Sequence, residues 1–509
     1  MRDLQNRLHE GVGGIEPAWN APEDVLRTVH RRGRLARLRA AVVATAIAVA
    51  AVTGTVTALR ENPPSPSTTA TAPIDVDALE LAWRADIGPI ALGQSLLADT
   101  QRLYVLDDEG VASYPKDCTD PCAPEWRAPI PRDANANANA IASLAVGDGV
   151  VFVTNGSSVF AFESDCATDG ATCAPLWEGA PPPGASSVDG PVASGRLVRV
   201  TYTLKGEGNR NRVFAAGFSA DGCEAGHECL PEWTVDLGSG VRYIPGTSVG
   251  GVFYQQVGDY LTGVGPSGCQ ASADGCEPLF RVEALGDERT QAGSLYGPVA
   301  AGEELIVASG DGNVYAFQPG CGTSCEPLWF GRASDYIEGQ PVVAGGVVAV
   351  VVKSEVVAFP IGCRDDGGEC DAAWWAPIDD YGTIAHADAD HVVLVDHQAR
   401  PNSIQVFPSD CRLTCAPLWK TGLPGEAQGV TSDGEHVFVG AQGGALTAYP
   451  LLCSGACTPS WTTTVDGRDV WNLVIDSQGL YVVASSSEPY PQALEGAPGS
   501  LYGFRVAGV

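Results

Sequence analysis

The sequence predicts an all-β propeller of four-stranded antiparallel blades, preceded by one transmembrane α-helix. Two observations lead to this expectation. The 16 cysteines form eight close pairs whose first members recur every 42 to 57 residues, and a charge-free apolar stretch precedes all of them. A period of this length is typical of one supersecondary unit copied around an axis.

The repeated unit is clearest between residues 297 and 329. Residues 304–308 and 314–317 are short apolar runs bounded by turn residues, which predicts two β-strands joined by the turn Ser-Gly-Asp-Gly. Residues 297–301 predict a shorter strand before them, and Pro-Leu-Trp at 327–329 begins a fourth strand after the cysteine pair. Four such strands make one propeller blade.

The cysteine pairs share one position in the unit, between the third and fourth strands. They are Cys118/Cys122, Cys166/Cys173, Cys223/Cys229, Cys269/Cys276, Cys321/Cys325, Cys363/Cys370, Cys411/Cys415 and Cys453/Cys457. Each unit supplies two cysteines and no recurring histidine, so zinc fits poorly and eight disulfides that close hairpins are expected. Closing so short a loop contributes on the order of 2 kcal/mol.

An aromatic residue follows each pair at a fixed position, and we expect it to pack between blades. These residues are Trp126, Trp177, Trp233, Phe280, Trp329, Trp374, Trp419 and Trp461, and Trp83 fills the same position without a cysteine pair.

The two ends of the repeat region predict ring closure. Residues 79–83 look like a fourth strand without its own blade, and residues 500–504 look like a third strand lacking its fourth. Joining them completes a mixed blade and leaves no open sheet edge. Together with the eight disulfide-bearing sets, this makes nine strand sets.

The repeat resembles the pyrroloquinoline-quinone-type, or quinoprotein-like, β-propeller repeat over residues 79–506. There the third strand reads like Val-Tyr-Ala-Phe at 314–317, a tight turn follows, and a tryptophan on the fourth strand docks on the next blade. The resemblance implies eight blades, so eight or nine are expected. Relatives are either non-catalytic scaffolds or enzymes that hold the quinone and a calcium ion in the central funnel.

The N-terminal region predicts a signal anchor. Residues 40–59 are uncharged and apolar and follow an arginine-rich stretch, so residues 1–39 are expected in the cytoplasm, ahead of a single transmembrane helix. A cleaved signal peptide fits less well because the leading segment is long. Residues 60–78 predict a Pro/Ser/Thr-rich linker, and residues 79–509 an extracytoplasmic propeller.

The charge is distributed unevenly along the chain. Residues 1–60 hold nine Arg against five Asp and Glu, a net charge of +4, whereas the remainder holds 21 basic and 56 acidic residues, a net charge of −35. This acidic part disfavours a nucleic-acid partner and an anionic cofactor. The expected partners are the cell membrane, through the one helix, and envelope proteins.

Motifs with possible chemistry are few. The string 386–391 alternates histidine and aspartate, but it aligns with the first-to-second-strand turn at 433–436, which favours a turn over a metal site. The Gly-x-Ser-x-Gly string at 246–250 precedes a predicted strand, whereas a nucleophile elbow needs a helix there. No catalytic, metal or cofactor-binding residue is assigned.

The sequence therefore favours a membrane-anchored binding or scaffold module without enzymatic activity and without a cofactor. One alternative is a dehydrogenase that uses PQQ and calcium, although the adjacent cysteine pair of many such alcohol dehydrogenases is absent from this sequence. A second alternative is a single-pass receptor or sensor. Arginine and acidic residues converging in the funnel would favour the enzyme, and apolar side chains filling it would favour the scaffold.

Overall fold

The computed structural model divides the chain into Met1–Asn62 and Pro63–Val509, and every residue it describes lies in the second unit. The described residues run from 73 to 506. Gaps occur at 91–94, 132–142, 167–170, 182–184, 206–210, 222–227, 240–246, 250–251, 258–259, 266–269, 273–274, 284–294, 323–324, 338, 380–381, 398–401, 454–456, 467 and 486–497.

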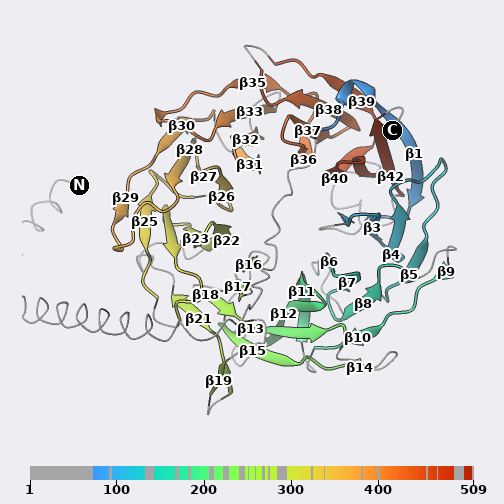
Figure 1. Cartoon of the computed structure of the whole chain (residues 1–509), viewed down its shortest axis with the longest axis horizontal. Helices are drawn as coiled ribbons and strands as arrows, with labels where there is room; N and C mark the ends of the chain where they lie inside the picture. Colours follow the sequence, from blue (N-terminus) through green and yellow to red (C-terminus); the bar gives the residue numbers. More distant parts are fainter. Residues whose placement is uncertain are drawn as a thin grey trace, which may run out of the picture. The chain divides into compact units, whose positions relative to one another are not determined.

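Nine antiparallel sheets of four main strands form a ring of blades (Figure 1). Blade 1 contains β2 (Leu96–Ala98), β3 (Arg102–Asp107), β4 (Gly110–Pro115) and β5 (Trp126–Pro129). Blade 2 contains β6 (Ser143–Gly147), β7 (Val150–Thr154), β8 (Val159–Glu163) and β10 (Trp177–Gly179). Blade 3 contains β11 (Ala185–Ser194), β12 (Leu197–Lys205), β13 (Asn211–Ser219) and β15 (Trp233–Ser239). Blade 4 contains β16 (Thr247–Val249), β17 (Val252–Val257), β18 (Tyr260–Val264) and β21 (Phe280–Glu283).

The second half of the ring repeats the same order. Blade 5 contains β22 (Leu295–Ala301), β23 (Glu304–Ser309), β24 (Asn313–Phe317) and β25 (Trp329–Arg332). Blade 6 contains β26 (Val342–Ala344), β27 (Val347–Val352), β28 (Glu355–Pro360) and β30 (Trp374–Pro377). Blade 7 contains β31 (Gly382–Ala387), β32 (His391–Asp396), β33 (Ser403–Pro408) and β35 (Trp419–Gly422). Blade 8 contains β36 (Ala427–Ser432), β37 (His436–Ala441), β38 (Ala445–Pro450) and β39 (Trp461–Thr464).

Blade 9 closes the ring with strands from both ends of the chain. Its order is β1 (Leu79–Ile87), β42 (Gly499–Val506), β41 (Gly479–Ser485) and β40 (Asp469–Asp476). The antiparallel register of β1 on β42 runs from Leu79 opposite Val506 to Ile87 opposite Gly499. The predicted closure is confirmed, and the blades number nine rather than the eight that the family resemblance implies.

A repeated strand pairing explains the sequence motif. The docking aromatic on the fourth strand always stands opposite a residue of the third strand that is small in eight of nine blades, such as Ala316 for Trp329 and Gly503 for Trp83; blade 7 has Val406. The small residue leaves room for the aromatic ring. This is the physical reason why alanine follows the tyrosine in the third-strand pattern.

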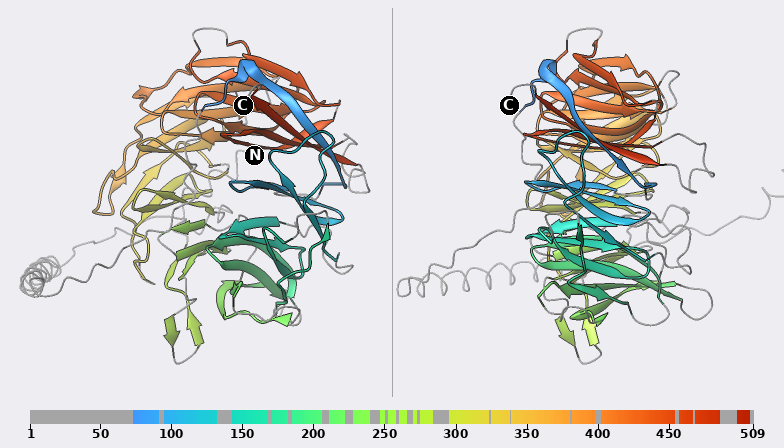
Figure 2. Two further views of the ribbon diagram at one scale, coloured as in Figure 1. Left: turned by 45° about the vertical axis from the view of Figure 1, so that its right-hand side comes forward. Right: turned by 90° about the vertical axis from the view of Figure 1, so that its right-hand side faces the viewer.

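Six short strands lie outside the main ladders. β9 (Ala171–Thr172), β14 (Glu228–Cys229), β29 (Glu369–Cys370) and β34 (Leu413–Thr414) each add to a blade as a fifth strand, whereas β19 (Gln270–Ser272) pairs with β20 (Gly275–Glu277) in a separate hairpin. Figure 2 shows that this hairpin extends beyond the rim of the ring.

The predicted membrane helix at 40–59 lies outside the described residues, as do the segment 1–39 and the first part of the linker 60–78. Within the residues that the structure describes, no helix is long and apolar enough to span a bilayer. The end of the predicted linker is not free of the propeller. Ile74 and Val76 are buried, and a short 3-10 helix, η1 (Val76–Ala78), leads directly into β1.

Candidate functional site

Six of the eight predicted cysteine pairs form disulfides in the described structure. These are Cys118–Cys122, Cys166–Cys173, Cys321–Cys325, Cys363–Cys370, Cys411–Cys415 and Cys453–Cys457. Cys229 is also disulfide-bonded, but Cys223 and Cys269 lie outside the described residues, and the Cys276 side chain is likewise not described. Each of the six closes the hairpin between the third and fourth strands, as predicted.

The cysteine loops also bind the neighbouring blade. β9, β14, β29 and β34 all lie in cysteine loops, and each pairs in parallel with the outer strand of the preceding blade. For example, the Cys415 N–H donates to the Trp375 carbonyl at 2.7 Å, and the Cys173 N–H donates to the Arg127 carbonyl at 2.9 Å. The disulfide therefore shapes a segment that completes another sheet.

The docking aromatics contact the blade that follows their own. Trp126 donates from Nε1 to the Ser164 carbonyl at 2.9 Å, and Trp419 donates to the Leu451 carbonyl at 2.8 Å. Trp374 lies 6.3 Å from the Phe407 ring, centroid to centroid, in a stacked arrangement. These side chains are buried in eight of the nine blades, the exception being Trp461, which is half-buried.

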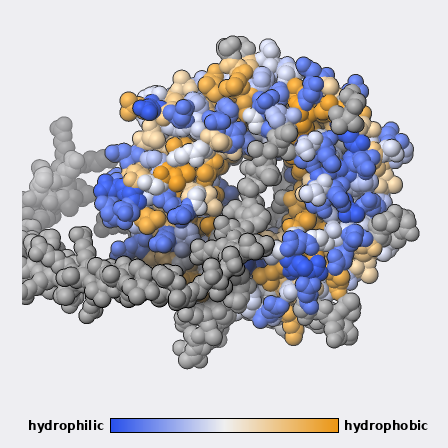
Figure 3. Space-filling view, in the orientation of Figure 1, coloured by the Kyte–Doolittle hydropathy of each residue, from blue (hydrophilic) through white to orange (hydrophobic). Residues whose placement is uncertain are grey.

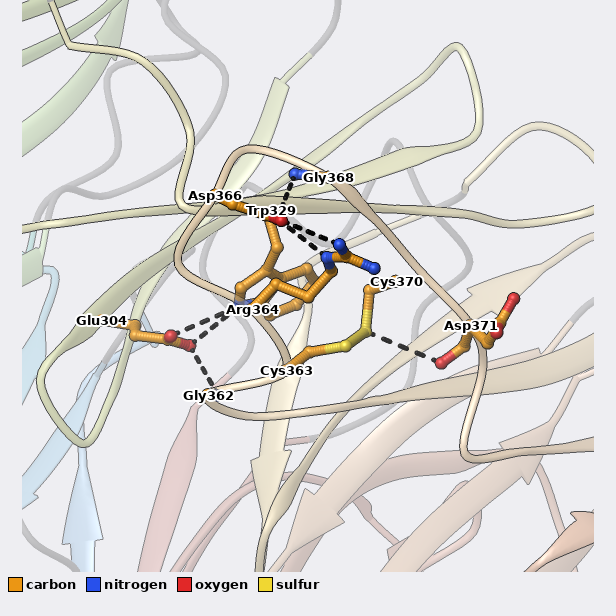
Figure 4. Close-up of a disulfide and its surroundings, with 9 residues drawn as sticks. All are labelled: Glu304, Trp329, Gly362, Cys363, Arg364, Asp366, Gly368, Cys370 and Asp371. Carbon is orange, nitrogen blue, oxygen red and sulfur yellow. Dashed lines mark hydrogen bonds and ion pairs between the residues drawn. A yellow bond between two sulfur atoms is a disulfide. The ribbon is translucent and has the colours of Figure 1, made fainter. Parts of the chain in front are cut away.

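Glu304 replaces the usual carbonyl acceptor at the seam between blades 5 and 6 (Figure 4). Both of its carboxylate oxygens lie 3.2 Å from Trp329 Nε1, and one also accepts the Gly362 N–H at 3.2 Å. The side chain is only 8% exposed. A buried carboxylate thus joins the tryptophan of one blade to the cysteine loop of the next, through charge-assisted hydrogen bonds.

We expect Glu304→Gln to lower the free energy of unfolding by about 1–2 kcal/mol, because one carboxylate oxygen becomes an amide donor that faces N–H donors. The adjacent Glu303 is exposed, so Glu303→Gln is the matched control and should leave stability unchanged. Chemical unfolding followed by tryptophan fluorescence measures both. Equal midpoints for the two variants would show that the Glu304 contacts contribute nothing.

The string 386–391 contains the turn between β31 and β32, as its alignment predicted: His386 lies in β31, residues 388–390 form the turn and His391 begins β32. Asp388 accepts the backbone N–H groups of Asp390 and His391 at 2.8 and 2.7 Å, between β31 and β32. Asp433 accepts those of Glu435 and His436 in the matching turn of blade 8. Among the described residues, no three histidine, cysteine or carboxylate side chains are grouped to hold a metal ion.

Asp433 has a further contact that the sequence did not reveal. Its second carboxylate oxygen accepts the Ile74 N–H at 3.0 Å, which fastens the segment before β1 to blade 8. Burial acts to raise the pKa of Asp433, but hydrogen bonds from His436, Ile74 and Glu435 outweigh it, and the pKa is lowered.

Because the pKa of Asp433 is lower in the folded than in the unfolded state, its ionised carboxylate stabilises the fold. This stabilisation is fully present above the unfolded pKa and is lost as the pH falls through the folded pKa. Asp433→Asn should therefore reduce stability at pH 7, and its difference from the wild-type protein should shrink well below pH ~4, the ordinary aspartate value. Thermal unfolding at pH 7 and at pH ~3 measures this. A difference that stays constant with pH would contradict it.

The Gly-x-Ser-x-Gly serine is not on a nucleophile elbow. Ser248 lies in β16, which pairs with β17, so a strand rather than a helix follows. Its hydroxyl accepts a hydrogen bond from Arg199 at 3.3 Å. This fits a polar contact between blades 3 and 4.

The innermost strands of eight of the nine neighbouring blade pairs pack against one another, and β40 of blade 9 meets β2 of blade 1; the exception within the described chain is β11 and β16. As the structure describes them, these nine strands contain no lysine or arginine, and the ionisable side chains described on them belong to His386, Asp469 and Asp476. Asp469 accepts the Gly443 N–H, and Asp476 pairs with Lys116 across the closing seam. In the face shown in Figure 3, hydrophobic residues gather beside the centre of the ring, whereas much of the rim is hydrophilic.

No family model and no curated protein matches this chain. Solved structures with a similar fold include the computationally designed Ika8 protein, with 9% identity, a TM-score of 0.47 and coverage of 83% of this chain and 99% of that one. BamB from Moraxella catarrhalis has 13% identity, a TM-score of 0.39 and coverage of 74% and 98%. Sqt1 from Saccharomyces cerevisiae has 7% identity, a TM-score of 0.43 and coverage of 83% and 95%. The propeller assignment rests on the strand pairing of this chain itself.

Proposed function

We propose that this chain is a single-pass membrane protein whose propeller acts as a binding or scaffold module on the outer side of the cell membrane. The observation that carries the proposal is the composition of the innermost strands, which lack cationic residues where they are described. A funnel that holds an anionic quinone needs lysine or arginine to neutralise it. Binding through the outer surfaces and connecting loops is the use of the fold that remains.

The described polar groups support the same conclusion. Glu304, Asp388, Asp433 and Asp476 are each engaged by turns or by neighbouring blades, so these buried or half-buried carboxylates stabilise the ring. A catalytic site would instead show converging acid and base groups with room for a reacting atom. The alternative proposal, a quinone- and calcium-dependent dehydrogenase, would need cationic groups at the funnel, and the innermost strands contain none where they are described.

The location of the propeller is tested by labelling two introduced cysteines in intact cells with a membrane-impermeant maleimide. Gly346→Cys lies in an exposed turn and should react, whereas Asn20→Cys in the N-terminal segment should react only after permeabilisation. Equal labelling of both positions in intact cells would contradict the proposed topology.

Binding is tested by photo-crosslinking from exposed positions spread over the nine blades, with the full chain in native membranes. A discrete adduct from a few neighbouring positions supports a binding module. If none of the positions gives an adduct, the proposed binding function is contradicted.

A further inference from the structure

The outer edge of blade 8 is the one that no cysteine loop follows. In four blades, the outer strand receives an added parallel strand from the cysteine loop of the next blade. In the described structure, blades 3, 4, 7, 8 and 9 have no such strand. Nine blades share eight cysteine pairs, and blade 9 is the one without a pair because its third and fourth strands come from the two ends of the chain. The outer strand of blade 8, β39, therefore has no cysteine loop to complete it.

The segment that precedes β1 does not supply the missing strand. Counting back from Trp83, Asp77 to Leu79 hold the positions that carry the added strand in the other blades. Here Asp77 and Ala78 lie in η1, and Leu79, the first residue of β1, donates its N–H to the Val76 carbonyl. The 3-10 turn fills the hydrophobic space between blades 8 and 9, and no strand of the described residues pairs with the outer edge of β39.

The backbone groups left at this edge can be identified from the other blades. The residue after the docking aromatic points its backbone N–H and carbonyl away from its own blade, toward the cysteine loop of the next blade. In blade 5, the Phe330 N–H donates to the Gly368 carbonyl, and in blade 6 the Trp375 carbonyl accepts the Cys415 N–H. Thr462 holds this position in blade 8. Within the described part of the chain, no backbone group bonds to its outward N–H or carbonyl.

The side chains at this edge are exposed as well. Thr462 and Thr464 are exposed, and Trp461 is the one half-buried member of the nine docking aromatics. Trp461 still donates from Nε1 to the Leu79 carbonyl at 3.0 Å, so its ring is held in place while part of it stays open to solvent. An edge of unpaired backbone beside an ordered aromatic ring is suited to strand addition.

The charges beside the edge indicate the type of strand that fits. Asp75, Asp77 and Glu80 are exposed on the segment that leads into β1, and Glu435 is exposed beside the turn that holds Ile74. Among the residues described, none of these four carboxylates forms an ion pair. A segment with lysine or arginine side chains complements them.

We propose that the outer edge of β39 binds an extended, basic segment of another exported protein, which adds to blade 8 as a parallel fifth strand. This inference rests on the proposed binding function and specifies one surface for it. The mode of binding is the one that the chain itself uses in blades 1, 2, 5 and 6.

The test uses the full oxidised chain in detergent and a fluorescein-labelled synthetic peptide of eight alternating threonine and lysine residues. We expect saturable one-to-one binding by fluorescence anisotropy, with weaker affinity at high salt. Thr462→Pro removes the outward N–H, a change that edge strands tolerate, and should weaken binding at least about tenfold. Thr462→Val keeps the backbone groups and is the matched control, which should bind like the wild-type protein.

Three results would overturn the proposal. The first is no saturable binding of the peptide to the wild-type chain, and the second is equal affinity of Thr462→Pro and the wild type for it. The third is a wild-type dimer that Thr462→Pro abolishes, because the edge would then bind a second copy of this chain. If Thr462→Pro does not fold, the double variant Asp77→Asn with Glu80→Gln is tested instead. Unchanged peptide affinity of that double variant would also overturn the proposal. Photo-crosslinked adducts that persist in Thr462→Pro would leave the binding function standing while this edge is excluded.

Discussion

Trp374→Ala is expected to lower the free energy of unfolding by about 3–5 kcal/mol, the cost of emptying a tryptophan site in a packed core. Trp374 is fully buried, stacks on Phe407 of blade 7 and donates to the Ser409 carbonyl at 2.9 Å. The substitution removes the ring contact with Phe407 and that hydrogen bond, both of which join blade 6 to blade 7. Urea unfolding, followed by circular dichroism, measures the loss.

The next residue provides a matched control for this change. Trp375 points away from the core and is 41% exposed, so Trp375→Ala should change stability by about 0.5 kcal/mol or less. The loss of unfolding free energy should therefore differ several-fold between these two adjacent tryptophans, because their side chains lie on opposite faces of β30. Similar losses for both variants would contradict the assignment of Trp374 as the docking aromatic.

Gly503→Val is expected to destabilise the closing blade by about 3 kcal/mol, because added side-chain atoms there overpack the core. Gly503 stands opposite Trp83, and a Cβ atom at this position would lie 2.3 Å from the Trp83 ring. Trp83 also donates to the Lys116 carbonyl of blade 1, so displacing it opens the seam between the first and last blades.

The control for this second variant is Gly346→Val, in an exposed turn where an added Cβ meets nothing within 4 Å. It should leave the unfolding midpoint within experimental error of the wild-type value. If Gly503→Val were equally neutral, the ring would not depend on the packing of β1 against β42.

Much of the fold could be predicted because each blade repeats the same local signals. The run at 314–317, the cysteine pair and the following tryptophan recur in register, so the hairpins, six described disulfides and the mixed closing blade followed from spacing alone. The number of blades did not follow in the same way. The family resemblance favoured eight, whereas the nine strand sets counted in the sequence all form blades.

Apart from the docking aromatics, the contacts between blades could not be predicted, because they join residues about one repeat apart that have no shared pattern. The pairing of Cys415 with Trp375 needs the relative height of two blades, which spacing does not encode. Glu304 has an ordinary position at the start of a strand, and its role at the seam with Gly362 appears only in three dimensions. Ile74 was assigned to the linker by composition, although Asp433 and the core of blades 8 and 9 hold it.

The proposal that this propeller is a binding module, and its quinone-enzyme alternative, are separated by calorimetric titration of the full chain with PQQ and calcium. We expect no saturable heat and no change in the quinone spectrum, because the described innermost strands offer no cationic group to the anionic cofactor. Stoichiometric, calcium-dependent binding of PQQ would contradict the proposal.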